Sequence, residues 1–115
     1  MPGLNEIGRE AHALAVAKGF WPEDVELGEQ FWRDAGIAAF GVAAEGHELA
    51  DAIRSGDPFA PCDKPVALTR VEEEIADVLL RVLDLAHVLG VDAEKAVARK
   101  HAYNRTRPKR NGKVF

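Results

Sequence analysis

The sequence predicts an all-α fold, a bundle of four to five helices, on three observations. Apolar residues recur every three or four positions in several long stretches, as they do on the buried side of a helix. Glycine and proline divide the chain into pieces of helix length, at residues 19–22, 55–65, 90 and 108. No stretch alternates polar and apolar residues convincingly, as a half-buried strand would. A helical bundle is consistent with all three.

The first helix is expected over residues 4–18, where Leu4, Ile7 and Leu14 lie at helical spacing. Asn5, or a residue just before it, can cap its start. The chain then meets Gly and Pro, which end the helix.

The second helical stretch is expected over residues 24–54. It is rich in alanine, which favours helix, but Gly36 and Gly41 can kink or interrupt it, so it forms either one helix or two. Its candidate core residues are Phe31, Ile37, Ala38, Val42, Leu49 and Ile53.

The third helix, over residues 68–89, has the clearest pattern in the chain. Before it, the segment SGDPFAPCDKP carries three prolines and predicts an irregular loop, which Pro65 or Val66 joins to the helix. Gly90 supplies the stop. One wide apolar face is formed by Val71, Ile75, Val78, Leu79, Val82, Leu85, Ala86 and Leu89.

The last helix is expected to begin after Asp92, a capping residue, and to run toward Tyr103, with Ala93, Ala96 and Val97 facing inward. Beyond it, Pro108 and Gly112 end the regular structure. We expect one domain over residues 1–115, with a basic tail over about residues 105–115.

A 115-residue chain buries a smaller share of its surface than a longer one, so oligomerisation, as a homodimer or homotetramer, is expected to complete the bundle. With Cys62 as its single cysteine and no basic or long apolar start, the chain is expected to be cytoplasmic. Asp, Glu or Arg interrupts every apolar segment, so no membrane span is expected.

The net charge of −4 is unevenly distributed. All 19 acidic residues lie at or before Glu94, and the seven positive charges from Arg99 onward leave the first 98 residues at −11. An acidic body with a basic end is typical of a site where cations and phosphates meet, of a tail that contacts nucleic acid, or of solvated terminal charge.

Two pairs of carboxylates stand out. Glu45 and Glu48 are three residues apart on the second stretch, and Glu74 and Asp77 are three apart on the third. Residues at this spacing project from the same side of a helix, one turn apart. Glu74 and Asp77 also lie at the edge of the apolar face, where they can point into a cleft.

Four carboxylates gathered on neighbouring helices repel one another unless cations neutralise them. Mg²⁺ prefers oxygen ligands, whereas zinc or iron would favour His or Cys, so the quartet predicts a Mg²⁺ site, with Mn²⁺ as a possible substitute. The alternative is ordinary surface charge, since acids three apart occur by chance on many helices.

These residues resemble a known family. Glu45-x-x-Glu48, a gap of 25 residues, and Glu74-x-x-Asp77 look like the defining signature of the all-α NTP pyrophosphatases, the superfamily of MazG-like proteins and dimeric dUTPases. The segments KGFWP, VEEEIADVLLRVLDLAHVLGVD and KHAYNRTRP are also similar to small bacterial and phage MazG-like proteins, so the likeness extends from about Lys18 onward.

The resemblance implies a MazG-like fold and the hydrolysis of a (d)NTP to a (d)NMP and pyrophosphate, for nucleotide-pool control or housecleaning. It implies that Glu45, Glu48, Glu74 and Asp77 bind Mg²⁺. A water molecule would be the nucleophile, with Glu48 or Glu45 as its base. It further implies that Lys100 and Asn104 contact the substrate, and Arg107 lies where it can clamp the anionic phosphates. Asn111 stands where small phage-like members often carry His, so substrate preference can differ here.

Several other residues are possible members of the site. Trp21 and Trp32 can stack on a base, although packing is the commoner role for such aromatics. Asp51 is either a supporting acid or solvated, and Arg81 is a possible ion-pair partner of Asp77. Asp84 and His87 form a D-x-x-H pair, but helical geometry turns His87 away from the carboxylate edge, and no metal-ligand spacing involves His12, His47 or His101.

Three other functions fit parts of the sequence. A phosphoribosyl-ATP pyrophosphohydrolase would share the fold and the carboxylates. A nucleic-acid-binding helical module would use the basic segment 105–113 instead, although nucleic acid is not the favoured partner. A non-catalytic assembly module would leave the acids without a function.

Overall fold

The computed structural model describes residues 1–22 and 28–114, and their regular elements are helical. These elements are α1 (Leu4–Ala17), α2 (Glu29–Arg54), α3 (Arg70–Val88), α4 (Ala93–Arg105) and a short 3₁₀ helix, η1 (Lys109–Gly112). The one β pairing in the described residues is an isolated bridge between Pro61 and Thr69. The all-α prediction is therefore confirmed.

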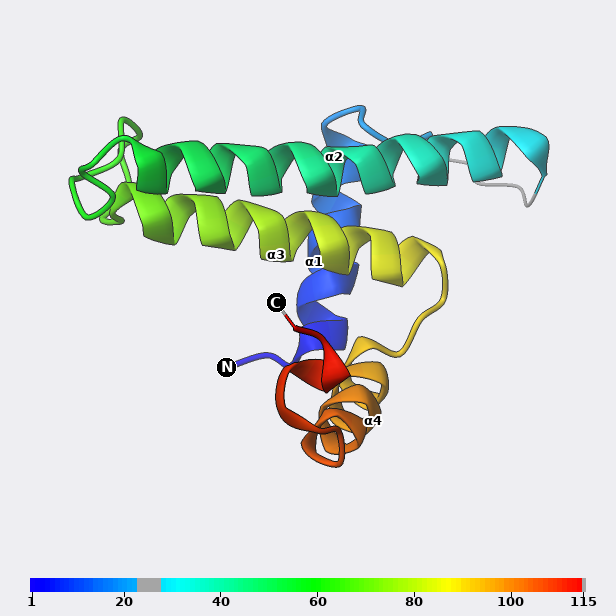
Figure 1. Cartoon of the computed structure of the whole chain (residues 1–115). Helices are drawn as coiled ribbons and strands as arrows, with labels where there is room; N and C mark the ends of the chain where they lie inside the picture. Colours follow the sequence, from blue (N-terminus) through cyan, green and yellow to red (C-terminus); the bar gives the residue numbers. More distant parts are fainter. Residues whose placement is uncertain (23–27, 115) are drawn as a thin grey trace.

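Two long antiparallel helices form the centre of the structure (Figure 1). α2 and α3 lie side by side and are joined by the loop of residues 55–69, while α1 crosses this pair and packs on α3. α4 packs against α1, away from α2 (Figure 1). This arrangement places one helix hairpin, α2–α3, where both predicted carboxylate pairs lie.

The boundaries of α3 follow from local hydrogen bonds. Thr69 Oγ1 accepts a hydrogen bond from the Glu72 backbone N–H at 3.2 Å, and Glu72 Oε1 accepts one from the Thr69 N–H at 2.9 Å. This reciprocal capping box satisfies two backbone donors at the helix start. Gly90, with φ +71°, turns the chain after the last residues of the helix, as expected.

α2 is one continuous helix, which decides between the two alternatives left open by Gly36 and Gly41. Neither glycine adopts a positive φ, so both keep helical geometry. Residues 24–27, where this helix was expected to begin, lie outside the described residues.

The cap of α1 was expected at Asn5 or at a residue just before it, and the structure shows the second alternative: Gly3 is the N-cap residue, and Asn5 lies inside the helix. The Asn5 side chain instead accepts a hydrogen bond from the Ala93 N–H at 2.8 Å and donates one to Asp92 Oδ1 at 2.9 Å. Asp92 Oδ1 also accepts from the Lys95 N–H at 3.0 Å and so caps α4 as predicted. Asn5 therefore joins the starts of α1 and α4.

α1 approaches α3 very closely at Gly8. A Cβ atom at this position would lie 2.6 Å from the carbonyl oxygen of Leu83, so the crossing requires glycine. Leu83 is buried beneath α1, although it was not among the apolar residues expected on this face of α3.

Much of the expected core remains at the surface of the single chain. Ile37 is 67% exposed, Ile53 is 55% exposed and Leu79 is 51% exposed, and no large side chain in the described residues is fully buried. The chain exposes 8724 Å², whereas a compact monomer of its mass exposes about 6,200 Å². Its radius of gyration is 16.5 Å, against about 13 Å for a compact domain of this length. The single chain therefore leaves apolar surface uncovered.

Candidate active site

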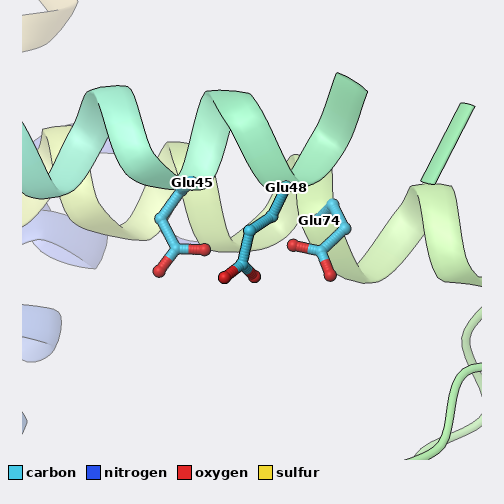
Figure 2. Close-up of side chains that lie close together, drawn as sticks. All are labelled: Glu45, Glu48 and Glu74. Atoms are coloured by element: carbon cyan, nitrogen blue, oxygen red, sulfur yellow. The ribbon is translucent and has the colours of Figure 1, made fainter. Parts of the chain in front are cut away.

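The two carboxylate pairs meet across the α2–α3 hairpin. Oxygen atoms of Glu45, Glu48 and Glu74 lie within 4.8 Å of one another. Figure 2 shows their carboxylates gathered along one side of the two helices. A second group, which shares Glu74, consists of Glu73, Glu74 and Asp77 within the same distance limit. The structure thus brings all four predicted acids into one cluster.

Glu73 belongs to this cluster, although it was not among the acids predicted from the sequence. The three-residue spacing selected Glu74 and Asp77, whereas Glu73 precedes Asp77 by four positions, which also places both residues on one side of a helix. Glu73 is 8% exposed and forms an ion pair with Lys64 of the loop, with 2.5 Å between Nζ and Oε1. The run of three glutamates at 72–74 was the available signal.

The surroundings of Glu74 disfavour the ionised form of its carboxyl group. Burial, and then the nearby charge of Glu48, raises the pKa of the Glu74 carboxyl above its ordinary value. Its Oε2 atom is buried and has no hydrogen-bond partner. A buried carboxylate oxygen without a donor costs free energy unless a cation coordinates it. Together with the oxygen-only donor set, this oxygen fits a hard divalent cation.

The predicted ion pair between Arg81 and Asp77 is not what the structure shows. Arg81 Nη2 lies 3.2 Å from Glu45 Oε1 instead, because the arginine reaches across from α3 to α2. Asp51 belongs to neither carboxylate group. It is exposed and lies 3.5 Å from His47 Nε2, which favours the solvated alternative.

A pocket of about 720 Å³ opens between α1, α2 and α3 beside the cluster. Its lining is mainly apolar and includes Phe20, Trp21, Ile37 and Leu80. Asp77 of the cluster and Arg81 also line it. The pocket and the carboxylates therefore form one continuous site, with an apolar part and an anionic part.

Two lining residues of this pocket, Trp21 and Asp84, belong to a polar network that the sequence did not predict. Asp84 Oδ2 accepts a hydrogen bond from Trp21 Nε1 at 2.9 Å, and Asp84 Oδ1 lies 2.7 Å from His12 Nδ1. The His87 ring stacks at a tilt on His12, with 5.3 Å between centroids. Trp21 is buried, as its packing role requires, whereas Trp32 is 62% exposed and contacts Phe31 edge-on.

The predicted substrate residues lie on or after α4, apart from the cluster. Lys100 and Asn104 are exposed on α4. Lys100 Nζ lies 4.9 Å from the centroid of the Tyr103 ring, and the guanidinium carbon of Arg107 lies 5.8 Å from the same centroid. Within the described residues, no hydrogen bond or ion pair joins α4 to the cluster. The Asn111 side chain lies outside the description.

Two features define the class of this protein: its fold is all-α, and carboxylates from the neighbouring helices α2 and α3 lie close together in one cluster. Residues 39–110 match the family described as the MazG nucleotide pyrophosphohydrolase domain. The match spans more than half of the chain, so the chain belongs to this family, as the resemblance predicted. All seven predicted site residues lie within the matched region.

Two further comparisons, with curated proteins and with solved structures, returned no significant match. Among the described residues, no helix combines the length and apolar character that crossing a membrane requires. Family membership places the chain among nucleotide pyrophosphohydrolases, which act on nucleotides.

Proposed function

We propose that this protein is a Mg²⁺-dependent nucleoside triphosphate pyrophosphohydrolase that converts a (d)NTP to a (d)NMP and pyrophosphate, in nucleotide-pool control or housecleaning. One observation carries the proposal. In a chain of the MazG family, carboxylates of α2 and α3 converge around Glu74, one oxygen of which is buried without a donor. Such an arrangement calls for a divalent cation.

Glu45, Glu48, Glu74 and Asp77 would hold the metal. Neither carboxylate group includes a His or Cys ligand, which favours Mg²⁺ and allows Mn²⁺ as a substitute. When bound, Mg²⁺ supplies Lewis acidity to phosphate oxygens and to a water molecule.

Glu48 is the better candidate for the general base. Glu45 already pairs with Arg81, whereas Glu48 is exposed and has no ion pair within the described residues. An exposed carboxylate beside the metal can accept the proton of the attacking water and release it to solvent. Arg81, at the border of pocket and cluster, is placed to neutralise phosphate charge.

The apolar pocket would receive the nucleoside. A volume of about 720 Å³ accommodates a small ligand of this size. Because Asp77 lines both the pocket and the cluster, a nucleoside in the pocket directs its phosphates toward the carboxylates. This supports a nucleotide, rather than pyrophosphate alone, as the substrate.

A homodimer or homotetramer would complete the site. Large apolar side chains of α2 and α3 are exposed in the single chain, and its accessible surface is larger than that of a compact monomer. Apolar surface of this type is typical of an oligomer interface. Since α4 packs on α1 in its own chain, we place the substrate contacts of Lys100, Asn104 and Arg107 in a neighbouring copy's site. The single-domain organisation and the cytoplasmic location stay predictions alongside this assembly.

The test is a pyrophosphate-release assay over NTPs, dNTPs and phosphoribosyl-ATP with Mg²⁺ or Mn²⁺. Glu48→Gln and Asp77→Asn should each lower kcat by a factor of about 100 or more. The exposed α1 variant Glu10→Gln should match wild type. Equal activity, or equal inactivity, of all proteins across the panel would refute the proposal, and activity on phosphoribosyl-ATP alone would favour that enzyme instead.

Subunit mixing tests the shared site. The expected result follows if each site of a dimer combines the carboxylates of one copy with α4 of the other. When the inactive variants Glu48→Gln and Lys100→Ala are mixed, half of the dimers contain one chain of each, and each of these mixed dimers has one intact site. Activity should then recover to about a quarter of wild type. No recovery, with mixed dimers confirmed by mass spectrometry, would place α4 and the carboxylates of one chain in the same site.

A further inference from the structure

Lys64 holds a positive charge against the carboxylate cluster from the loop between α2 and α3. Its Nζ lies 2.5 Å from Glu73 Oε1 and 3.2 Å from Asp63 Oδ1. The Glu73 side chain is only 10% exposed, whereas Lys64 and Asp63 reach solvent. A buried carboxylate is stable only when paired, so Lys64 is the charge partner that Glu73 requires.

The loop backbone fixes the position of this lysine. The Cys62 N–H donates a hydrogen bond to the Leu68 carbonyl at 3.0 Å, and the Val66 N–H donates one to the Lys64 carbonyl at 2.8 Å. The first bond closes the loop around Lys64, and the second forms a tight turn that begins at Lys64. The ammonium is therefore held at the cluster by an ordered turn.

Each of the two carboxylate groups of the cluster has one member paired with a side-chain cation, Glu45 with Arg81 at 3.2 Å and Glu73 with Lys64 at 2.5 Å. The lysine contact is the shorter of the two, and its charge is concentrated on one compact ammonium rather than spread over a guanidinium. Each group offers three oxygen ligands within 4.8 Å of one another, and Glu74 belongs to both. The group formed by Glu73, Glu74 and Asp77 already contains a cation, the Lys64 ammonium bound to Glu73. A divalent ion on the same carboxylate would be repelled by that ammonium at short range.

We propose that Lys64 is a tethered counter-ion that keeps Glu73 out of the metal shell and so limits how many divalent ions the cluster binds. Glu74 and Asp77 stay available to the metal, and Glu73 serves as the anchor of the loop. Lys64 is thus a positioning residue, which acts through Glu73. The inference rests on the proposed function, because it assumes that the cluster binds divalent cations.

The test counts Mn²⁺ ions bound per full-length chain by electron paramagnetic resonance, with circular dichroism as the check on folding. Lys64→Met should bind about one Mn²⁺ more than wild type, because Glu73, Glu74 and Asp77 then form a free oxygen site. Lys64→Arg restores the charge and should return the count to that of wild type. Adding Glu73→Gln to Lys64→Met should abolish the extra ion, and Lys95→Met, on exposed α4, should change nothing.

Glu73→Gln alone provides a second measurement that does not depend on Lys64→Met folding. If Lys64 keeps Glu73 out of the shell, this variant binds as many Mn²⁺ ions as wild type. A lost ion, or a Kd weakened about tenfold, would show that Glu73 is itself a ligand and would overturn the inference. An unchanged count in folded Lys64→Met would also overturn it, whereas wild type that binds no Mn²⁺ would refute the proposed function itself.

Discussion

Replacing Glu74 with Gln should stabilise the metal-free protein and destroy its response to divalent cations. The carboxylate is surrounded by other carboxylates, and its Oε2 is buried without a partner. A buried unsatisfied acceptor costs about 1–3 kcal/mol. At roughly 4 °C per kcal/mol for a chain of this length, Glu74→Gln should raise Tm by about 4–12 °C in EDTA.

The effect depends on pH in a defined direction. Burial and the neighbouring acids raise the folded-state pKa of Glu74 above its ordinary value of 4.5. The folded protein therefore holds this proton more tightly than the unfolded chain does, and metal-free wild type loses stability as pH rises through the raised pKa. Below the ordinary value both states are protonated, and the difference between wild type and Glu74→Gln should disappear.

Calorimetry in EDTA and in saturating Mg²⁺, at acidic and neutral pH, measures the difference in Tm between wild type and Glu74→Gln and the response of each protein to Mg²⁺. At neutral pH, Mg²⁺ at about 100 times its Kd should add about 2.7 kcal/mol to wild type, and far less to Glu74→Gln. Glu10→Gln, a charge change on exposed α1, controls for net charge. A lower Tm for Glu74→Gln than for wild type in neutral EDTA, or an equal Mg²⁺ response of both proteins, would refute the reasoning.

Two stability predictions test the α1–α3 crossing and the Trp21–Asp84 hydrogen bond beside the site. Gly8→Ala should lower the free energy of unfolding by about 1–3 kcal/mol, because its Cβ would meet the Leu83 carbonyl oxygen at 2.6 Å. Gly36→Ala, with open space around the Cβ, should instead raise the free energy of unfolding by up to about 1 kcal/mol. If chemical denaturation showed the two variants to change stability in the same direction, the close crossing at Gly8 would be contradicted. Trp21→Phe should cost about 1–3 kcal/mol, because it removes the donor to a part-buried carboxylate, whereas Trp32→Phe should stay within about 0.5 kcal/mol, and equal losses would count against the network.

The sequence was a good guide to features that depend on neighbouring residues. The capping role of Asp92, the stop at Gly90 and the extent of α3 within two residues all follow from contacts inside one helix or turn. The spacing of Glu45 with Glu48 and of Glu74 with Asp77 is likewise local, since helical periodicity alone puts each pair on one side.

Contacts between elements could not be read in this way. Arg81 pairs with Glu45 rather than with Asp77, and Asp84 binds His12 and Trp21, because the rotation and crossing of the helices decide which side chains meet. The same holds for Leu83, which is buried where α1 crosses α3 rather than at the centre of the predicted apolar face.

The sequence by itself determined the helices, the two acidic pairs and, through its motifs, the family. Only the tertiary structure decided that Glu74 lies close to both Glu45 and Glu48, that Glu73 joins the cluster while paired with Lys64, and that α4 packs on α1. The physical reason is range. Backbone hydrogen bonds and helical periodicity act over a few residues, whereas the loop path and the helix crossings that assemble a charged site depend on the whole chain.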